Sequence, residues 1–89
     1  MNKILLITTV GCEGCRIMKN SIETALQKAN ADINFTVKES TELNKSFIQK
    51  AKITDFPTTL FYKDDRIVFK ATGSVPSIIV SRWITVQFE

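Results

Sequence analysis

Two cysteines lie where a strand-like run of residues gives way to a helix-like one. Residues 4–7 form the apolar run, Cys12 and Cys15 follow it, and residues 13–29 carry apolar side chains at helical spacing. Unpaired amides at a helix N-terminus favour a negatively charged thiolate. Two thiols at this spacing can also close a small disulfide ring. The pair therefore predicts thiol-disulfide chemistry at a strand-to-helix junction.

The rest of the chain alternates between strand and helix patterns. Strands are predicted at residues 3–9, 33–37, 59–62 and 67–71, where apolar and β-branched residues run together or alternate. Helices are predicted at 13–29, at 40–52 with Ser40 or Thr41 as N-cap, and at 75–88 with Ser74 as N-cap and Pro76 in the first turn. The order β-α-β-α-β-β-α predicts an α/β fold. Its mixed four-stranded sheet has a parallel first pair, an antiparallel hairpin and flanking helices.

The last segment is rich in Ile, Val and Thr, which favours a strand, but its spacing and its N-terminal signals favour a helix. One apolar stripe is expected to cover the sheet: Val75, Ile79, Trp83 and Val86. A second is expected to wrap the sheet edge or to meet another surface: Val80, Ile84 and Phe88. We therefore expect a monomer or a weak homodimer formed through this helix.

Composition bounds the remaining possibilities. The 89 residues suffice for one domain, 1–89, and the absence of histidine excludes histidine catalysis and histidine metal ligands. Basic and acidic residues are interspersed, which argues against nucleic-acid binding. The N-terminal apolar run is too short for a secretory signal, and no run is long enough to span a membrane. Both cysteines belong to one C-x-x-C motif, so we expect a cytoplasmic protein with transient disulfides.

Four features together resemble the thioredoxin and glutaredoxin superfamily over nearly the whole chain. They are C-x-x-C at a strand-to-helix junction, a second βα unit, Phe56-Pro57-Thr58 before a hairpin, and Gly73 before the closing helix. Residues 53–65 are particularly similar to the thioredoxin segment around its cis-proline. The resemblance implies a thioredoxin-like fold and no cofactor or metal apart from a redox-active disulfide. It also implies disulfide-containing protein substrates and an upstream reductase as partners.

The activity implied by the resemblance is that of a thiol-disulfide oxidoreductase that reduces protein disulfides. Cys12 would be the nucleophile and Cys15 the resolving thiol, and helix polarity independently favours Cys12. Seven residues are expected to contact substrate, with Pro57 in the cis form: Gly11, Glu13, Gly14, Phe56, Pro57, Thr58 and Gly73.

Departures from the thioredoxin and glutaredoxin patterns carry consequences. Gly11 stands where thioredoxins have tryptophan, and Glu13-Gly14 stands where they have Gly-Pro, so we expect a more flexible loop. Leu6 occupies the position of their buried aspartate, which leaves no carboxylate to accept a proton beneath the dithiol. The glycine and acidic pairs of a glutaredoxin glutathione site are not evident.

Two alternatives remain open. Residues 9–15 and 22–26 also resemble heavy-metal-associated domains, which carry Cu(I) between two cysteine thiolates. That resemblance covers only the first third of the chain, and those domains continue as βαββαβ. The chain could also be a binding module whose cysteines are incidental.

Overall fold

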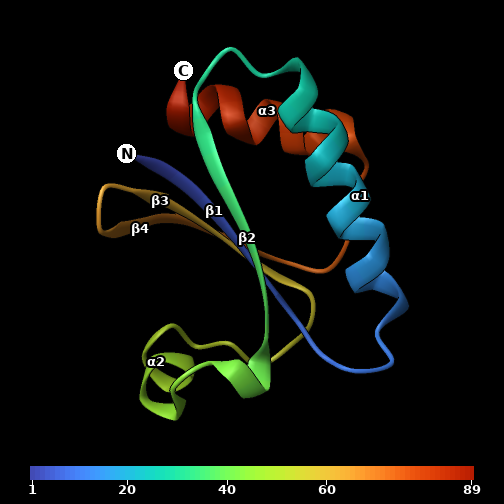
Figure 1. The fold of residues 1–89 in the computed structure, drawn as a ribbon, viewed down its shortest axis with the longest axis vertical. Helices are drawn as coiled ribbons and strands as arrows, with labels where there is room; N and C mark the ends of the chain where they lie inside the picture. Colours follow the sequence, from blue (N-terminus) through green and yellow to red (C-terminus); the bar gives the residue numbers. More distant parts are fainter.

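Strand β1 (Asn2–Thr8) lies inside a four-stranded sheet of order β2-β1-β3-β4 in the computed structural model, which describes residues 1–89 (Figure 1). It pairs in parallel with β2 (Ile33–Glu39) and antiparallel with β3 (Thr58–Lys63). Strand β4 (Arg66–Thr72) completes an antiparallel hairpin with β3. The predicted element order and mixed sheet are therefore confirmed.

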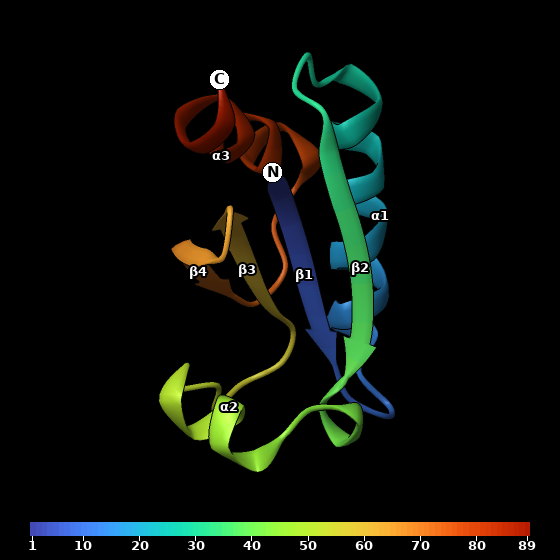
Figure 2. The same cartoon turned by 60° about the vertical axis from the view of Figure 1, so that its left-hand side comes forward.

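The helices cover the two faces of the sheet unequally. Helices α1 (Glu13–Lys28) and α3 (Ser77–Phe88) pack over one face, whereas the short α2 (Lys45–Lys50) lies near the end where β1 and β2 finish (Figure 2). Successive side chains of β1 face opposite sides of the sheet, so this strand contributes to the packing on both faces. No helix combines the length and the apolar character that a membrane crossing requires.

Two buried clusters fill the space on either side of the sheet. The larger one lies beneath α1 and α3 and consists of Ile4, Leu6, Met18, Ile22, Ala25, Phe61, Val80 and Ile84. The smaller one lies on the α2 side and consists of Leu5, Ile7, Ile53, Leu60 and Tyr62. Burial from both faces explains why the first strand is apolar without alternation.

The second helix begins later than predicted. Residues Ser40–Glu42 form a separate 3-10 turn, and Asn44 is the N-cap of α2, accepting a hydrogen bond from the Ser46 amide at 2.7 Å. The assignment of Ser40 or Thr41 as N-cap was wrong, because the chain turns twice there and each turn has its own cap. The helix also ends two residues early, before Lys52, whose φ of 56° is left-handed.

The third helix is present, but its start and its buried face differ from the prediction. Pro76, in an extended conformation, is the N-cap, so Ser74 lies outside the helix. The buried stripe is Val80 and Ile84, both 1% exposed or less, whereas Val86 is 72% exposed. The stripe expected to meet another surface is thus part of the core beneath α1. Val80 and Ile84 are therefore not free to meet another surface, and a weak homodimer through α3 stays a prediction.

Candidate active site

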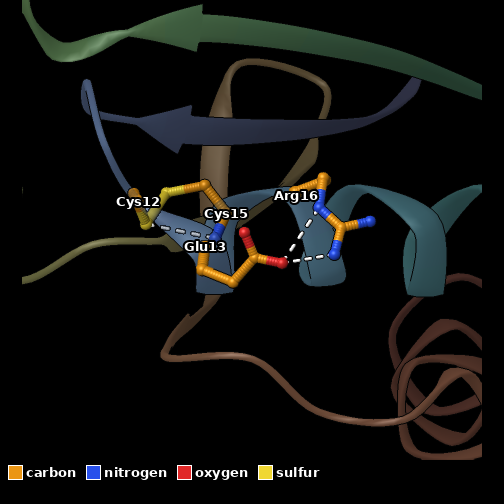
Figure 3. Close-up of polar contacts among 4 residues, drawn as sticks. All are labelled: Cys12, Glu13, Cys15 and Arg16. Carbon is orange, nitrogen blue, oxygen red and sulfur yellow. Dashed lines mark hydrogen bonds and ion pairs between the residues drawn. A yellow bond between two sulfur atoms is a disulfide. The ribbon is translucent and has the colours of Figure 1, made fainter.

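The two cysteines lie where β1 passes into α1, joined in a disulfide with their Cα atoms 5.3 Å apart (Figure 3). Gly11 precedes them with a φ of 73°, a left-handed conformation that favours glycine. Cys12 is half-buried, whereas Cys15 is only 5% exposed. An incoming group can therefore reach the sulfur of Cys12 more easily than that of Cys15.

The sulfur of Cys12 is the N-cap acceptor of α1. The Cys15 amide donates a hydrogen bond to this sulfur at 3.1 Å, as the dashed line in Figure 3 shows. Amides at the start of a helix of 16 residues stabilise negative charge there. The same donor is available to a Cys12 thiolate, so the geometry favours Cys12 as the attacking thiol.

An exposed ion pair lies next to the disulfide in sequence, because Glu13 is inside the C-x-x-C motif and Arg16 follows it. Arg16 donates two hydrogen bonds to one carboxylate oxygen of Glu13, and both side chains are exposed (Figure 3). The hydrogen bond from Arg16, followed by its charge, holds the pKa of Glu13 below its ordinary value. The negative charge inside the C-x-x-C motif is therefore largely balanced by Arg16 rather than left facing Cys12.

The Pro57 loop and the segment after β4 meet the C-x-x-C motif. The Phe56–Pro57 peptide bond is cis, the geometry that the resemblance implied. A Cβ atom added to Gly14 would lie 3.4 Å from Pro57 Cδ and 3.8 Å from Ser74 Oγ. The Gly73 amide, in turn, donates to the Pro57 carbonyl at 2.8 Å. Three segments distant in sequence thus converge beside the dithiol.

Phe56 and Thr58, also expected at the site, present little side chain to solvent. The Phe56 ring packs against the cluster on the α2 side of the sheet. Thr58 is fully buried, and its hydroxyl donates to the Asp55 carbonyl at 2.6 Å. Any contact with substrate at these positions would therefore involve backbone groups, and the assigned binding roles remain predictions.

Three exposed residues near the dithiol were not predicted as site residues. Val10 is 85% exposed and Ile17 is 43% exposed, and they flank the C-x-x-C motif on either side. The hydroxyl of Ser74, which sequence reasoning assigned to a helix cap, lies beside Gly14 instead. The sequence signal available for Val10 was an apolar residue directly before Gly11. Val10 and Ile17 therefore add exposed apolar surface next to the motif.

Leu6, which the resemblance places beneath the dithiol, is fully buried and contributes no polar atom. Its cross-strand partner on β3 is Thr59, also fully buried, whose Oγ1 has no hydrogen-bond partner. No group of three or more cysteine, aspartate or glutamate side chains that could hold a metal ion is present.

Comparisons with known proteins agree with this geometry. The family model described as Thioredoxin matches residues 3–85, while no curated protein matches the chain. Three solved structures resemble it. A thioredoxin-2 described as a component of malaria parasite protein secretion machinery gives a TM-score of 0.79 at 16% identity, covering 98% of this chain and 84% of that one. Aeropyrum pernix thioredoxin gives 0.75 at 22% identity, with coverage of 98% and 75%. A malarial protein gives 0.80 at 15% identity, with coverage of 100% and 99%.

Proposed function

Because this chain belongs to the thioredoxin family and has its fold, we propose that it reduces protein disulfides by exchange at Cys12 and Cys15. Family membership together with the C-x-x-C pair supports a thiol-disulfide oxidoreductase in general. The observation that carries the specific assignment is the 3.1 Å hydrogen bond from the Cys15 amide to the Cys12 sulfur. It provides a donor for the charge of an attacking thiolate.

The proposed reaction has two exchange steps. The Cys12 thiolate attacks one sulfur of a substrate disulfide, and the other substrate sulfur leaves as a thiolate. The Cys15 thiolate then attacks the Cys12 sulfur, which forms the Cys12–Cys15 disulfide and releases the second substrate thiolate. The substrate gains two electrons and, after protonation, two hydrogens. An upstream dithiol reductase must return two electrons to the pair before the next turnover.

The surroundings of Cys12 suit a substrate that approaches as an extended segment. The Pro57 loop stands against Gly14, and Phe56 can offer backbone groups to such a segment while its ring stays anchored. Gly11 and Gly73 add backbone without side chains at the same place. Exposed Val10 provides an apolar contact for residues next to the substrate disulfide.

The compartment is part of the proposal. A reductant of this kind works where an upstream reductase keeps its dithiol reduced, and a chain whose two cysteines both belong to the reactive motif fits that setting. We therefore assign it to the cytoplasm.

Turnover of insulin disulfides tests the assignment. With dithiothreitol as the electron donor, the protein should accelerate insulin reduction, and the Cys12→Ser and Cys15→Ser variants should lose most of this acceleration. In parallel, the reduced protein is mixed with Cu(I) and a competing chelator. The element order is not the βαββαβ order of the copper-carrying domains, so copper should pass to the chelator. No acceleration of insulin reduction, together with retained copper, would reverse the assignment.

A further inference from the structure

The hydroxyl of Thr59 is a buried polar group without a partner. Thr59 is fully buried in β3, and its Oγ1 is the one buried side-chain nitrogen or oxygen that makes no hydrogen bond. Burying a hydroxyl without a partner destabilises a protein, and valine would fill the same volume without this cost. We therefore expect the Thr59 hydroxyl to have a function that valine could not perform.

Strand alternation directs Thr59 to the side of the sheet that α1 covers. Along β3, the side chains of Thr59 and Phe61 share one face, and Pro57 precedes the strand two residues before Thr59. Pro57 lies against Gly14 at the start of α1, and Phe61 belongs to the core cluster that contains Met18. Thr59 thus stands between Pro57, which lies against Gly14, and Phe61, which shares a cluster with Met18.

On α1, the inward-facing residue between Gly14 and Met18 is Cys15. It follows Gly14, precedes Met18 by one turn, and faces inward with only 5% of its surface exposed. The cross-strand neighbour of Thr59 is Leu6, a member of the same cluster as Met18. Leu6 is apolar, so Thr59 contributes the polar side-chain atom of this cross-strand pair.

We propose that Thr59 is the positioning residue of Cys15: in the reduced protein its hydroxyl hydrogen-bonds the Cys15 sulfur, directly or through one buried water. A hydroxyl can accept from a thiol and donate to a thiolate. In the disulfide the Cys15 sulfur has neither a proton nor a charge, and Oγ1 makes no hydrogen bond in the oxidised protein. Reduction of the disulfide gives Thr59 Oγ1 a hydrogen-bonding partner in the Cys15 thiol or thiolate.

This contact rests on the proposed function and defines the second exchange step. Cys15 gives its proton to solvent or to the first substrate thiolate, and the Thr59 hydroxyl donates a hydrogen bond to the resulting sulfur anion. The Cys15 sulfur then bonds to the Cys12 sulfur, and the substrate sulfur leaves with the electron pair. Thr59 keeps its proton throughout. It supplies a hydrogen bond where the thioredoxin pattern has a carboxylate and this chain has Leu6.

The test compares Thr59→Val, which keeps the shape and removes the hydroxyl, with Thr59→Ser, which keeps the hydroxyl. Ser21→Ala, which removes another buried hydroxyl from α1, is the matched control. In a Cys12→Ser background, the alkylation rate of Cys15 is measured from pH 6 to 10. With Thr59→Val the profile should move to higher pH, and the rate near neutral pH should fall about tenfold. Thr59→Ser and Ser21→Ala should keep the original profile.

A second readout uses the protein with both cysteines. Thr59→Val should slow the release of substrate from the mixed disulfide about tenfold while leaving the alkylation rate of reduced Cys12 unchanged. Thr59→Ala is a second hydroxyl-free variant should the valine disturb packing. An unchanged Cys15 profile in folded Thr59→Val and Thr59→Ala would overturn the proposal. The Cys15 profile is measured without any substrate, so a failure of insulin reduction would count against the proposed function alone.

Discussion

Thr58 and Thr59 are adjacent and both fully buried in β3, but only the Thr58 hydroxyl has a hydrogen-bond acceptor. It donates to the Asp55 carbonyl at 2.6 Å, whereas Thr59 Oγ1 has no partner. Adjacent residues of a strand face opposite sides of the sheet. One hydroxyl therefore holds the loop that carries Pro57, and the other faces the side covered by α1.

Valine substitutions at these two threonines should have opposite effects on the stability of the oxidised protein. Thr58→Val removes a made hydrogen bond and should lower the free energy of unfolding by about 1–2 kcal/mol. Thr59→Val removes a buried hydroxyl that makes no hydrogen bond. It should leave the free energy of unfolding unchanged or raise it by up to about 1 kcal/mol. Urea denaturation midpoints measure both. An equal loss in the two variants would show that the hydroxyls are in equivalent environments.

The ion pair between Glu13 and Arg16 should tune the reactivity of Cys12. Glu13→Gln removes the negative charge within the motif and leaves Arg16 unbalanced, so the thiolate fraction of reduced Cys12 should increase. We expect its alkylation rate at pH 7 to rise about two- to threefold. Arg16→Gln should have the opposite effect, because Glu13 then faces Cys12 alone. Rates that fall in Glu13→Gln would contradict this view of the pair.

The same pair has a defined pH dependence. Arg16 holds the pKa of Glu13 below its ordinary value, chiefly through the hydrogen bond. A carboxyl whose pKa is lower in the folded state stabilises that state above its unfolded pKa and loses this contribution as the pH falls through the lowered value. Any dependence of Cys12 reactivity on Glu13 should therefore be constant from pH 6 upward. It should diminish only in acid, which alkylation of wild type and Glu13→Gln below pH 5 measures.

The closing helix provides a contrast between buried and exposed apolar residues. Ile84→Ala should lower the free energy of unfolding by about 2–4 kcal/mol, because the side chain is 1% exposed and its removal leaves a cavity. Val86→Ala, at a position 72% exposed, should change it by no more than about 0.5 kcal/mol. Denaturant titration of both variants tests the assignment of the buried face. A large loss of unfolding free energy in Val86→Ala would instead support the buried stripe that was predicted from the sequence.

The face of α3 could not be read from sequence because apolar residues occur on most of its sides. Ile78 and Val86 are exposed, whereas Val80 and Ile84 are buried, although all four are β-branched and apolar. Packing against α1 decides between them, and that packing is a tertiary property. The helix start was missed for a related reason. Pro76 adopts the cap conformation itself and leaves Ser74 free to lie beside the C-x-x-C motif.

By contrast, the sheet and the dithiol were predictable because their signals are local. The run at 4–7 and the hairpin around residues 63–66 have strand and turn chemistry, and Cys12 and Cys15 stand directly before a clear helical stripe. Thr59 had no such signal. A threonine within a strand is ordinary, and only the strand register shows that its hydroxyl is buried opposite Leu6.

Lys70 should anchor the small helix α2 to the sheet. Its ammonium group donates to the carbonyls of Ala51 and Lys52, at 3.1 and 3.0 Å, just after the helix ends. Lys70→Met keeps the aliphatic chain and removes these bonds, which should cost about 0.5–1 kcal/mol. Hydrogen exchange should therefore accelerate at the α2 amides and not in α1. Equal exchange in α2 of wild type and variant would show that Lys70 does not hold this helix.

Trapping the mixed disulfide tests most directly the claim that Cys12 attacks and Cys15 resolves. Each single variant, Cys12→Ser and Cys15→Ser, is reduced and mixed with a peptide that contains one disulfide. The reaction is quenched with acid, and the intact mass of the protein is measured by mass spectrometry. Cys15→Ser should accumulate the protein joined to one peptide half through Cys12, since the resolving thiol is missing. Cys12→Ser should accumulate little adduct, because its remaining thiol is buried. Rapid adduct formation at Cys15 alone, with none at Cys12, would contradict the account.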